Sequence, residues 1–262
     1  MNIIAFPGLG IDALTIKNTF SVFGFEIHYY GVIIALGIVL AYIFALYEGK
    51  SRDISSDTIL DIILYGLPSA VVCARIYYVI FQWDYFKRNP SDIIKIWEGG
   101  IAIYGAVIGA IISTYIYCRV KKIQFLKMAD IGAFGLLIGQ AIGRWGNFVN
   151  AEAYGGSTNL PWRMQLLDLG ISVHPTFLYE SLWNICVFII LFLYRKKQKF
   201  DGEIFLMYLT GYGLGRFWIE GLRADSLYLG PVRISQMVAL ACVLSGLVLI
   251  IYFRKKQKKV SI

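Results

Sequence analysis

The chain has 262 residues, of which 58% are hydrophobic and only 16% are charged, and its formal net charge is +8. So few charges cannot cover the surface of a soluble protein of this size. The composition, with a mean hydropathy of +0.63, therefore excludes a soluble globular protein and indicates an integral membrane protein. The apolar runs are continuous and carry small residues at helical spacing, which predicts α-helical spans rather than the alternating strands of a barrel.

We expect an all-α membrane protein with about seven transmembrane helices in one domain, residues 1–262. The expected spans, in chain order, are residues 28–47, 59–81, 101–118, 129–149, 175–194, 203–220 and 234–253. Residues 1–27 are mixed in composition and contain Pro7, so we expect them to form an ordered arm outside the bilayer. Residues 150–173 lack the apolar length of a span and contain Pro161 and Trp162, which predicts an extramembrane loop or small lid.

Basic residues gather at the ends of the apolar runs, as in R-K-K-Q-K after Tyr194 and R-K-K-Q-K-K after Phe253. The connections after the first, third, fifth and seventh spans hold 15 of the 25 Lys and Arg residues. Because positive residues favour the cytoplasm, we expect the N-terminus outside and the C-terminus inside, with the arm and the loop on the outer side. The first lysine is Lys17, so we expect the first span, rather than a cleaved signal peptide, to direct insertion. The same distribution suits anionic lipid and forms no stripe for nucleic acid, so we expect no nucleic-acid partner.

The stretch 139–156, G-Q-A-I-G-R-W-G-N-F-V-N-A-E-A-Y-G-G, places polar residues directly after an apolar run. In a helix, Arg144 and Asn147 share one face, next to a face of regularly spaced glycines that includes Gly143. A lone arginine near a helix end could simply extend to the interface and anchor the segment. However, an arginine at the centre of a membrane helix costs at least ~2.5–3.5 kcal/mol. Because Asn147 and Glu152 follow so closely, we favour a polar site over an anchor.

The predicted sixth span carries a second polar face. Tyr208, Tyr212, Arg216 and Glu220 follow one another at i+4, and Arg223 continues the face at i+3. Arg216 and Glu220 could simply pair with each other. That pair alone would not explain the two aromatic hydroxyls on one side of it and a second arginine on the other.

A third polar group, His174 and Glu180, lies at the start of the fifth span. His174 could equally be an interfacial cap, and two histidines in the whole chain are too few for a convincing metal site, so we expect no metal and no cofactor. Two or more membrane arginines that face a glycine-lined cavity suit a phosphate, because a guanidinium stays charged and presents a planar fork to phosphate oxygens. Since the cavity would open between helices, the phosphate would belong to a lipid.

A multi-pass transporter of a small anionic solute or lipid is the main alternative, since broken helices and intramembrane charges are also found in transporters. Two features favour a lipid-modifying enzyme. The polar residues gather toward one leaflet, and the sequence shows no pair of symmetric halves.

Five motifs, in order along nearly the whole chain, resemble those of one family. They are H-Y-Y-G at 28–31, W-E-G-G-I-A-I-Y-G at 97–105, G-R-W-G-N-F-V-N-A-E-A-Y-G at 143–155, H-P-T-F-L-Y-E at 174–180 and G-Y-G-L-G-R-F-W-I-E-G-L-R at 211–223. The family is that of the prolipoprotein diacylglyceryl transferases of bacterial plasma membranes. The motif at 143–155 is long and specific.

The resemblance implies a reaction, a place and partners. Family members transfer the diacylglyceryl group of phosphatidylglycerol to the lipobox cysteine thiol of a prolipoprotein, forming a thioether and releasing glycerol phosphate. It therefore implies a transferase of the bacterial plasma (inner) membrane with its active site toward the outer leaflet. Its partners would be phosphatidylglycerol, the prolipoprotein lipobox and the bilayer. Such a reaction needs a thiolate as nucleophile and stabilised charge on the departing phosphate.

The resemblance also implies roles for single residues. Arg144 would bind the phosphate of phosphatidylglycerol, with Arg216 as a second phosphate contact that Glu220 orients. The implied catalytic set is Tyr30, Tyr104, Asn147, Glu152, Arg216 and Glu220, and the implied supporting set is Gly143, Gly155, His174, Glu180, Tyr212 and Arg223.

Tyr104 departs from the family pattern, because some members have a histidine at this position. Histidine is an attractive general base, whereas a tyrosine with a pKa near ~10 is a poor one at neutral pH. Either Tyr104 only orients the substrate, or the base lies elsewhere, with Glu152, His174 and Glu180 as the candidates.

The expected orientation can be tested with single cysteines in intact cells. Cysteines introduced at positions 88 and 160 should react with an impermeant thiol reagent, whereas cysteines within 119–127 and 195–199 should resist it, because lysine-rich connections favour the cytoplasm. The opposite labelling pattern would overturn the charge argument.

Overall fold

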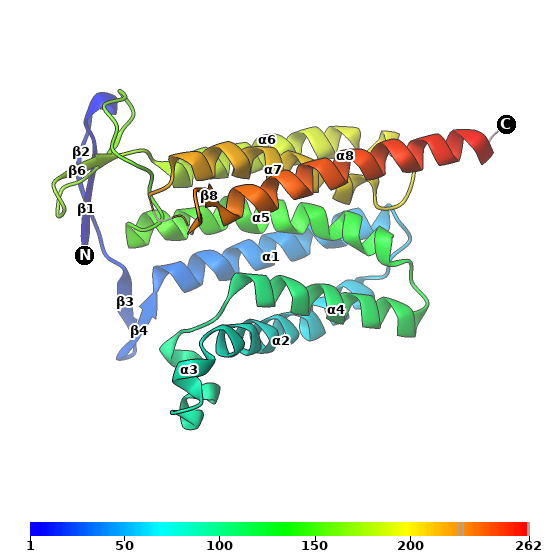
Figure 1. Cartoon of the computed structure of the whole chain (residues 1–262), viewed down its shortest axis with the longest axis horizontal. Helices are drawn as coiled ribbons and strands as arrows, with labels where there is room; N and C mark the ends of the chain where they lie inside the picture. Colours follow the sequence, from blue (N-terminus) through cyan, green and yellow to red (C-terminus); the bar gives the residue numbers. More distant parts are fainter. Residues whose placement is uncertain (225, 227, 261–262) are drawn as a thin grey trace. The chain divides into compact units, whose positions relative to one another are not determined.

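Helices dominate the structure, a computed structural model that describes residues 1–224, 226 and 228–260 (Figure 1). The long helices in the described residues are α1 (Tyr29–Lys50), α2 (Ser56–Phe81), α4 (Ile103–Lys121), α5 (Phe125–Asn150), α6 (Thr176–Tyr194), α7 (Glu203–Leu222) and α8 (Ile234–Val260). Each of the seven predicted spans lies on one of them. The predominantly helical membrane fold is therefore confirmed.

Six of these helices are long and apolar enough to cross a membrane within the described residues, so the chain is a multi-pass membrane protein. The remaining long helix is α7, which has 20 residues but carries Glu203, Arg216 and Glu220. A helix this polar is expected where neighbouring helices cover it, because a charged side chain facing lipid is costly. That α7 also crosses the membrane, and that the N-terminus lies outside and the C-terminus inside, remain predictions.

The chain forms two compact units. Residues Met1–Ala45 and Asp130–Ile262 make up the first, here the main unit, and residues Leu46–Ala129 make up the second, here the insert unit. Helices α1 and α5 each contribute to both.

Close packing of α5, α6 and α7 builds the core of the main unit. Its fully or nearly fully buried members are Ala133, Phe134, Leu137, Val187, Leu191, Ile204 and Tyr208. Glycines on α7 allow the close approach of α6, since a Cβ at Gly215 would lie 2.2 Å from the ring of Trp183. The indole nitrogen of Trp183 in turn donates a hydrogen bond to the carbonyl of Gly211 at 2.8 Å. Small residues at helix contacts are the usual way in which membrane helices gain packing energy.

Short strands fold the arm and part of the loop together, which the all-α prediction did not include. A four-stranded antiparallel sheet has the order β2 (Ile11–Ile16), β1 (Asn2–Phe6), β5 (Met164–Leu166), β6 (Ile171–Val173). A hairpin of β3 (Thr19–Val22) and β4 (Phe25–His28) leads into α1, and β7 (Tyr228–Leu229) pairs with β8 (Val232–Arg233) before α8. The sheet has its own buried cluster, which includes Ile4, Met164 and Val173. Pairing of β1 with β5 ties the start of the chain to the loop that precedes α6.

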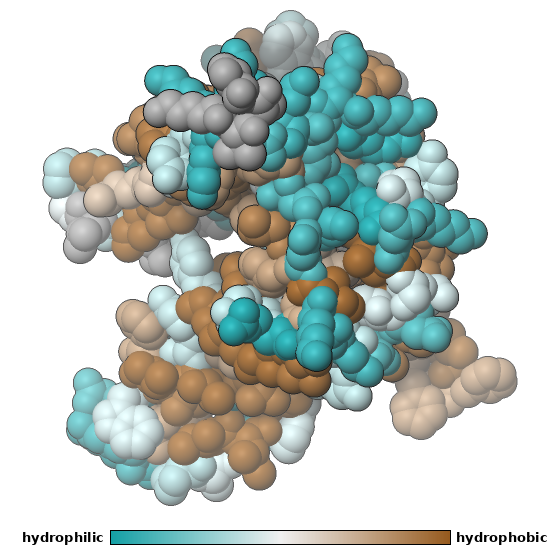
Figure 2. Space-filling model, turned by 90° about the vertical axis from the view of Figure 1, so that its right-hand side faces the viewer, coloured by the Kyte–Doolittle hydropathy of each residue, from teal (hydrophilic) through white to brown (hydrophobic). Residues whose placement is uncertain are grey.

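The end of the main unit where α8 finishes is hydrophilic, as Figure 2 shows from that side. The turn η4 (Arg195–Lys197) that follows α6 supplies three consecutive basic residues. The polar motif residues lie toward the other end of the same helices, because Glu203 begins α7 and Glu220 lies in its last turn.

In the insert unit, α2 continues through Pro68 and packs against α4. A buried arginine, Arg75 of α2, holds the connection between the two helices. Its guanidinium donates to the carbonyls of Asp92, Ile93, Gly99 and Gly100, at 2.7 to 2.8 Å for the last three. This connection contains α3 (Trp83–Phe86) and the turns η2 (Pro90–Ile94) and η3 (Ile96–Glu98).

Candidate functional site

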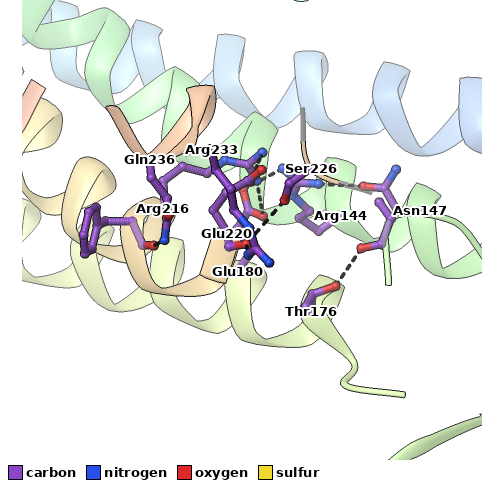
Figure 3. A network of polar contacts seen from close by, with 11 residues as sticks. Arg144, Asn147, Thr176, Glu180, Arg216, Glu220, Ser226, Arg233 and Gln236 are labelled. Carbon is purple, nitrogen blue, oxygen red and sulfur yellow. Dashed lines mark hydrogen bonds and ion pairs between the residues drawn. The ribbon is translucent and has the colours of Figure 1, made fainter. Parts of the chain in front are cut away.

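The polar motif residues of the main unit gather where α5 ends, α6 begins and α7 ends (Figure 3). Arg144 lies in the second half of α5, Glu180 in the first turns of α6, and Arg216 and Glu220 in the last turns of α7. We call these four residues the arginine–glutamate cluster. Arg216 and Glu220 share one face of α7 because they are four positions apart, while α5 and α6 bring one charged residue each.

Glu180 joins the two arginines of the cluster. Nη2 of Arg144 donates to Oε1 of Glu180 at 2.6 Å, and Nη1 of Arg216 donates to Oε2 of Glu180 at 3.1 Å. Arg216 also pairs with Glu220, with 2.7 Å between Nη2 and Oε2. One carboxylate therefore links three helices, while the pair predicted from the i+4 spacing on α7 also forms.

The carboxylates of the cluster are buried and the arginines are partly accessible. The side chains of Glu180 and Glu220 are 3% and 2% exposed, against 20% and 17% for Arg144 and Arg216. Two positive and two negative groups make the cluster neutral, which suits an apolar setting where an unpaired charge is costly. A guanidinium has five N–H donors, so the contacts drawn between the described residues leave donors of both arginines for an anion.

Asn147 and Glu152 extend the cluster toward the surface. Nη1 of Arg144 donates to Oδ1 of Asn147 at 3.0 Å, and Nδ2 of Asn147 donates to Oε1 of Glu152 at 2.9 Å. The chain turns sharply after α5, since Ala151 and Ala153 have positive φ angles of 51° and 56°. This turn lets the exposed carboxylate of Glu152 fold back onto Asn147.

Gly155 lies where three segments of the main unit meet. Its N–H donates to the carbonyl of His174 at 3.0 Å, and it forms an isolated β-bridge with Arg223. The N–H of Gly156 donates to the carbonyl of Leu222 at 2.7 Å. A Cβ at Gly155 would lie 2.6 Å from the Cβ of His174 and 2.9 Å from the carbonyl oxygen of Leu222. A side chain at this position is therefore excluded unless the loop, α6 or α7 moves.

Two predicted tyrosines lie on helices of the main unit, and only Tyr212 is next to the cluster along its own helix. The ring of Tyr30, at the start of α1, packs on Gly146, where a Cβ would lie 2.6 Å from the ring. Tyr212 precedes Arg216 by one turn of α7 and stacks on Tyr208 with 5.7 Å between ring centroids. The side-chain amide of Gln140 donates to the hydroxyl of Tyr208 at 2.8 Å.

The other predicted residues occupy separate positions. Gly143 is a contact between α5 and α1, because a Cβ there would lie 3.3 Å from Ile34. The half-buried ring of His174 has Nδ1 3.4 Å from the hydroxyl of Tyr179. Tyr104 belongs to the insert unit, in the first turn of α4, with 42% of its surface exposed. Its role stays a prediction.

Residues that the sequence did not single out hold the end of α7. Arg233 donates to the carbonyl of Glu220 and, through Nε, to the hydroxyl of Tyr228 at 2.9 Å. The side-chain amide of Gln236 donates to the carbonyl of Phe217 at 2.9 Å. All these partners lie within 20 residues of one another, and the turn between β7 and β8 brings them together. Gly230 and Pro231, which form this turn, are a recognisable turn signal in the sequence.

The chain matches the family model described as prolipoprotein diacylglyceryl transferase over residues 17–252. Curated proteins named phosphatidylglycerol–prolipoprotein diacylglyceryl transferase are similar over nearly their whole length. One from Clostridioides difficile is 48% identical over 92% of this chain and 97% of its own. One from Finegoldia magna is 50% identical over 92% of this chain and 96% of its own. One from Lysinibacillus sphaericus is 49% identical over 88% of this chain and 90% of its own.

The chain belongs to the prolipoprotein diacylglyceryl transferase family.

Three of the five motifs that carry the resemblance converge in the main unit. Residues 143–155 form the end of α5 and the turn after it, residues 174–180 form the start of α6, and residues 211–223 form the second half of α7. The motif at 28–31 adds Tyr30 at the start of α1. The three motifs on α5, α6 and α7 thus share one place in the main unit, where the arginine–glutamate cluster lies, whereas the motif at 97–105 belongs to the insert unit.

Gly155 and Gly156 offer a matched pair of substitutions. Gly155→Ala should lower stability by on the order of 1–3 kcal/mol, the usual cost of overpacking. Gly156→Ala should have little effect, because a Cβ there would meet only the carbonyl oxygen of Leu222 at an ordinary 3.8 Å. Thermal unfolding of both variants in the same detergent measures the difference. Equal effects of the two substitutions would show that the three segments are not tightly constrained at Gly155.

Proposed function

We propose that this chain transfers the diacylglyceryl group of phosphatidylglycerol to the lipobox cysteine of prolipoproteins, forming a thioether and releasing glycerol phosphate. The observation that carries the proposal is the convergence of three family motifs, at 143–155, 174–180 and 211–223, on two partly accessible arginines, Arg144 and Arg216, held by one buried carboxylate. The names of the relatives supply phosphatidylglycerol and prolipoprotein as the substrates.

The two arginines are proposed to bind the lipid phosphate. Guanidinium groups match the oxygens of a phosphodiester in a bidentate fork, which a lysine ammonium does not reproduce. Glu180 and Glu220 fix the orientation of both guanidinium groups before the lipid arrives, so little reorganisation is needed on binding. Asn147, bonded to Arg144, supplies an amide at the edge of the same site.

The reaction is a displacement at a glyceryl carbon. The sulfur of the cysteine forms a bond to that carbon, the bond between the carbon and the phosphate oxygen breaks, and the electron pair leaves on the phosphate. The departing group thereby gains a second negative charge, which fixed cationic donors stabilise best in the transition state. Arg144 and Arg216 would supply this stabilisation.

The thiol proton needs a base, and we propose Glu152. Its carboxylate is exposed and is joined to Arg144 through Asn147, so it lies beside the proposed phosphate site. Glu180 is a weaker candidate, because both of its oxygens already accept from arginines and its side chain is 3% exposed. His174 contacts Tyr179 instead. Tyr104 is then proposed to orient the substrate rather than to accept the proton.

We place the site toward the outer leaflet of a bacterial inner membrane. Glu203 and Glu220 are 17 positions apart on α7, about 25 Å along a helix, which is nearly the thickness of the hydrocarbon core. The basic turn Arg195–Lys197 comes directly before the Glu203 end. Since basic connections favour the cytoplasm, the cluster at the Glu220 end would face outward, where an exported lipobox arrives.

Purified protein in detergent, given phosphatidylglycerol and a synthetic lipobox peptide, tests the proposal. The peptide should gain one diacylglyceryl group by mass spectrometry, with an equal amount of glycerol phosphate released. A peptide with Cys→Ser should stay unmodified, because the hydroxyl is a far weaker nucleophile than a thiolate. Movement of a solute across liposomes, with both peptides untouched, would instead favour the transporter.

Arg144→Lys separates phosphate geometry from charge. This substitution keeps the charge but loses the planar fork, so the rate of diacylglyceryl transfer should fall by roughly 10²–10³, as for other preorganised donors. Tyr104→Phe should lower the transfer rate by less than Arg144→Lys does. Tyr104→His should stay active and shift the pH dependence of the rate. All three variants are compared with the unaltered protein in the peptide assay. Ordinary turnover by the Arg144→Lys protein would contradict the assignment of Arg144 to the phosphate.

A further inference from the structure

Glu180 has a feature that phosphate binding alone does not require. It is a carboxylate, almost fully buried, and it is shared by arginines from two different helices. Glu220, by contrast, lies on the same helix as its partner, Arg216, at i+4. If only orientation were needed, a neutral acceptor could hold Arg144 and leave the cluster positively charged. The negative charge of Glu180 instead brings the formal charge of the four-residue cluster to zero.

The charge of the cluster matters because the reaction changes the charge of its ligand. Under the proposed function, the phosphodiester of phosphatidylglycerol carries one negative charge. The phosphomonoester that leaves carries close to two at neutral pH, since the second pKa of a phosphomonoester is about 6. A strongly positive site would hold this product more tightly than the substrate, because attraction scales with the product of the charges.

We propose that Glu180 sets the charge of the arginine–glutamate cluster, so that the site holds a phosphodiester monoanion and releases a phosphomonoester dianion. Glu180 is then a positioning and charge-setting residue that acts through Arg144 and Arg216. The proposal rests on the proposed function and adds to it the step of product release.

The surroundings of Glu180 fix its position independently of its charge. The hydroxyl of the next residue, Ser181, donates to the carbonyl of Ala141 at 2.9 Å, and the indole of Trp145 donates to that hydroxyl at 3.3 Å. These bonds anchor the start of α6 to α5 beside residue 180. A Glu180→Gln protein should therefore keep the backbone in place, with an amide oxygen that still accepts from one arginine while the negative charge is lost.

The test compares two inhibitors of the peptide assay, glycerol phosphate and the diester glycerophosphoglycerol. The unaltered protein should be inhibited more strongly by the diester than by the monoester. In Glu180→Gln, the inhibition constant for glycerol phosphate should fall at least tenfold relative to that for the diester. The maximal rate should fall as well, because product release becomes slow. Glu180→Asp, which keeps the charge on a shorter side chain, should retain the inhibitor preference of the unaltered protein even if its rate drops.

Glu203→Gln is the matched control. Glu203 is fully buried and also bound by an arginine, with 2.6 Å between its Oε1 and Nη2 of Arg254, but it lies at the other end of α7. This variant removes the same charge from the same helix bundle and should leave the ratio of the two inhibition constants unchanged.

Several results would overturn the proposal. They are a stronger inhibition of the unaltered protein by the monoester, an unchanged inhibitor ratio in Glu180→Gln, and an equal change in Glu203→Gln. Each of these leaves the proposed function standing, provided that the unaltered protein modifies the peptide. Failure of the unaltered protein to form the thioether would instead remove the proposed function itself.

Discussion

The ion pairs from Glu180 to Arg144 and to Arg216 are the interaction on which this end of the main unit depends. They join α5, α6 and α7 in a part of the chain where each charge is costly unless it is compensated. Breaking a buried pair by removing one partner leaves the other charge unsatisfied. The four charged residues of the cluster therefore depend on one another. The apolar packing further along the helices is constrained differently, because a missing apolar side chain leaves a cavity and not an uncompensated charge.

Close approach of the helix backbones makes these pairs possible. Gly211 and Gly215 bring α7 against α6, and Gly155 lets the turn after α5 cross both. Hydrogen bonds through Ser181 and Trp145 then fix α6 against α5. The site is consequently assembled from ordinary helix packing, and its charged groups occupy the positions at which the packed helices end.

The sequence predicted the parts of this structure that depend on local patterns. Apolar length located the helices, and the i+4 spacing of Arg216 and Glu220 indicated their ion pair. The family motifs named Arg144, Asn147 and Glu152, although their catalytic roles stay predictions. The bond between Arg144 and Glu180 joins residues 36 positions apart, so no spacing rule could have found it. The sheet was missed for a similar reason, since its strands have three to six residues and β1 pairs with a segment some 160 residues away.

The hydrogen bonds of Arg75 determine which positions in the connection between α2 and α4 tolerate substitution. Its donors bind the carbonyls of Asp92, Ile93, Gly99 and Gly100, so the connection is held through its backbone and not through its side chains. Hydrogen bonds to backbone carbonyls do not depend on most of the side chains in the connection. Substitutions of exposed residues in the connection should therefore preserve the path of the chain into α4, except at Gly100, where a Cβ would lie 2.5 Å from Nη1 of Arg75. The same arrangement makes Arg75 itself hard to replace, because no single substitution in the connection could restore four lost donors.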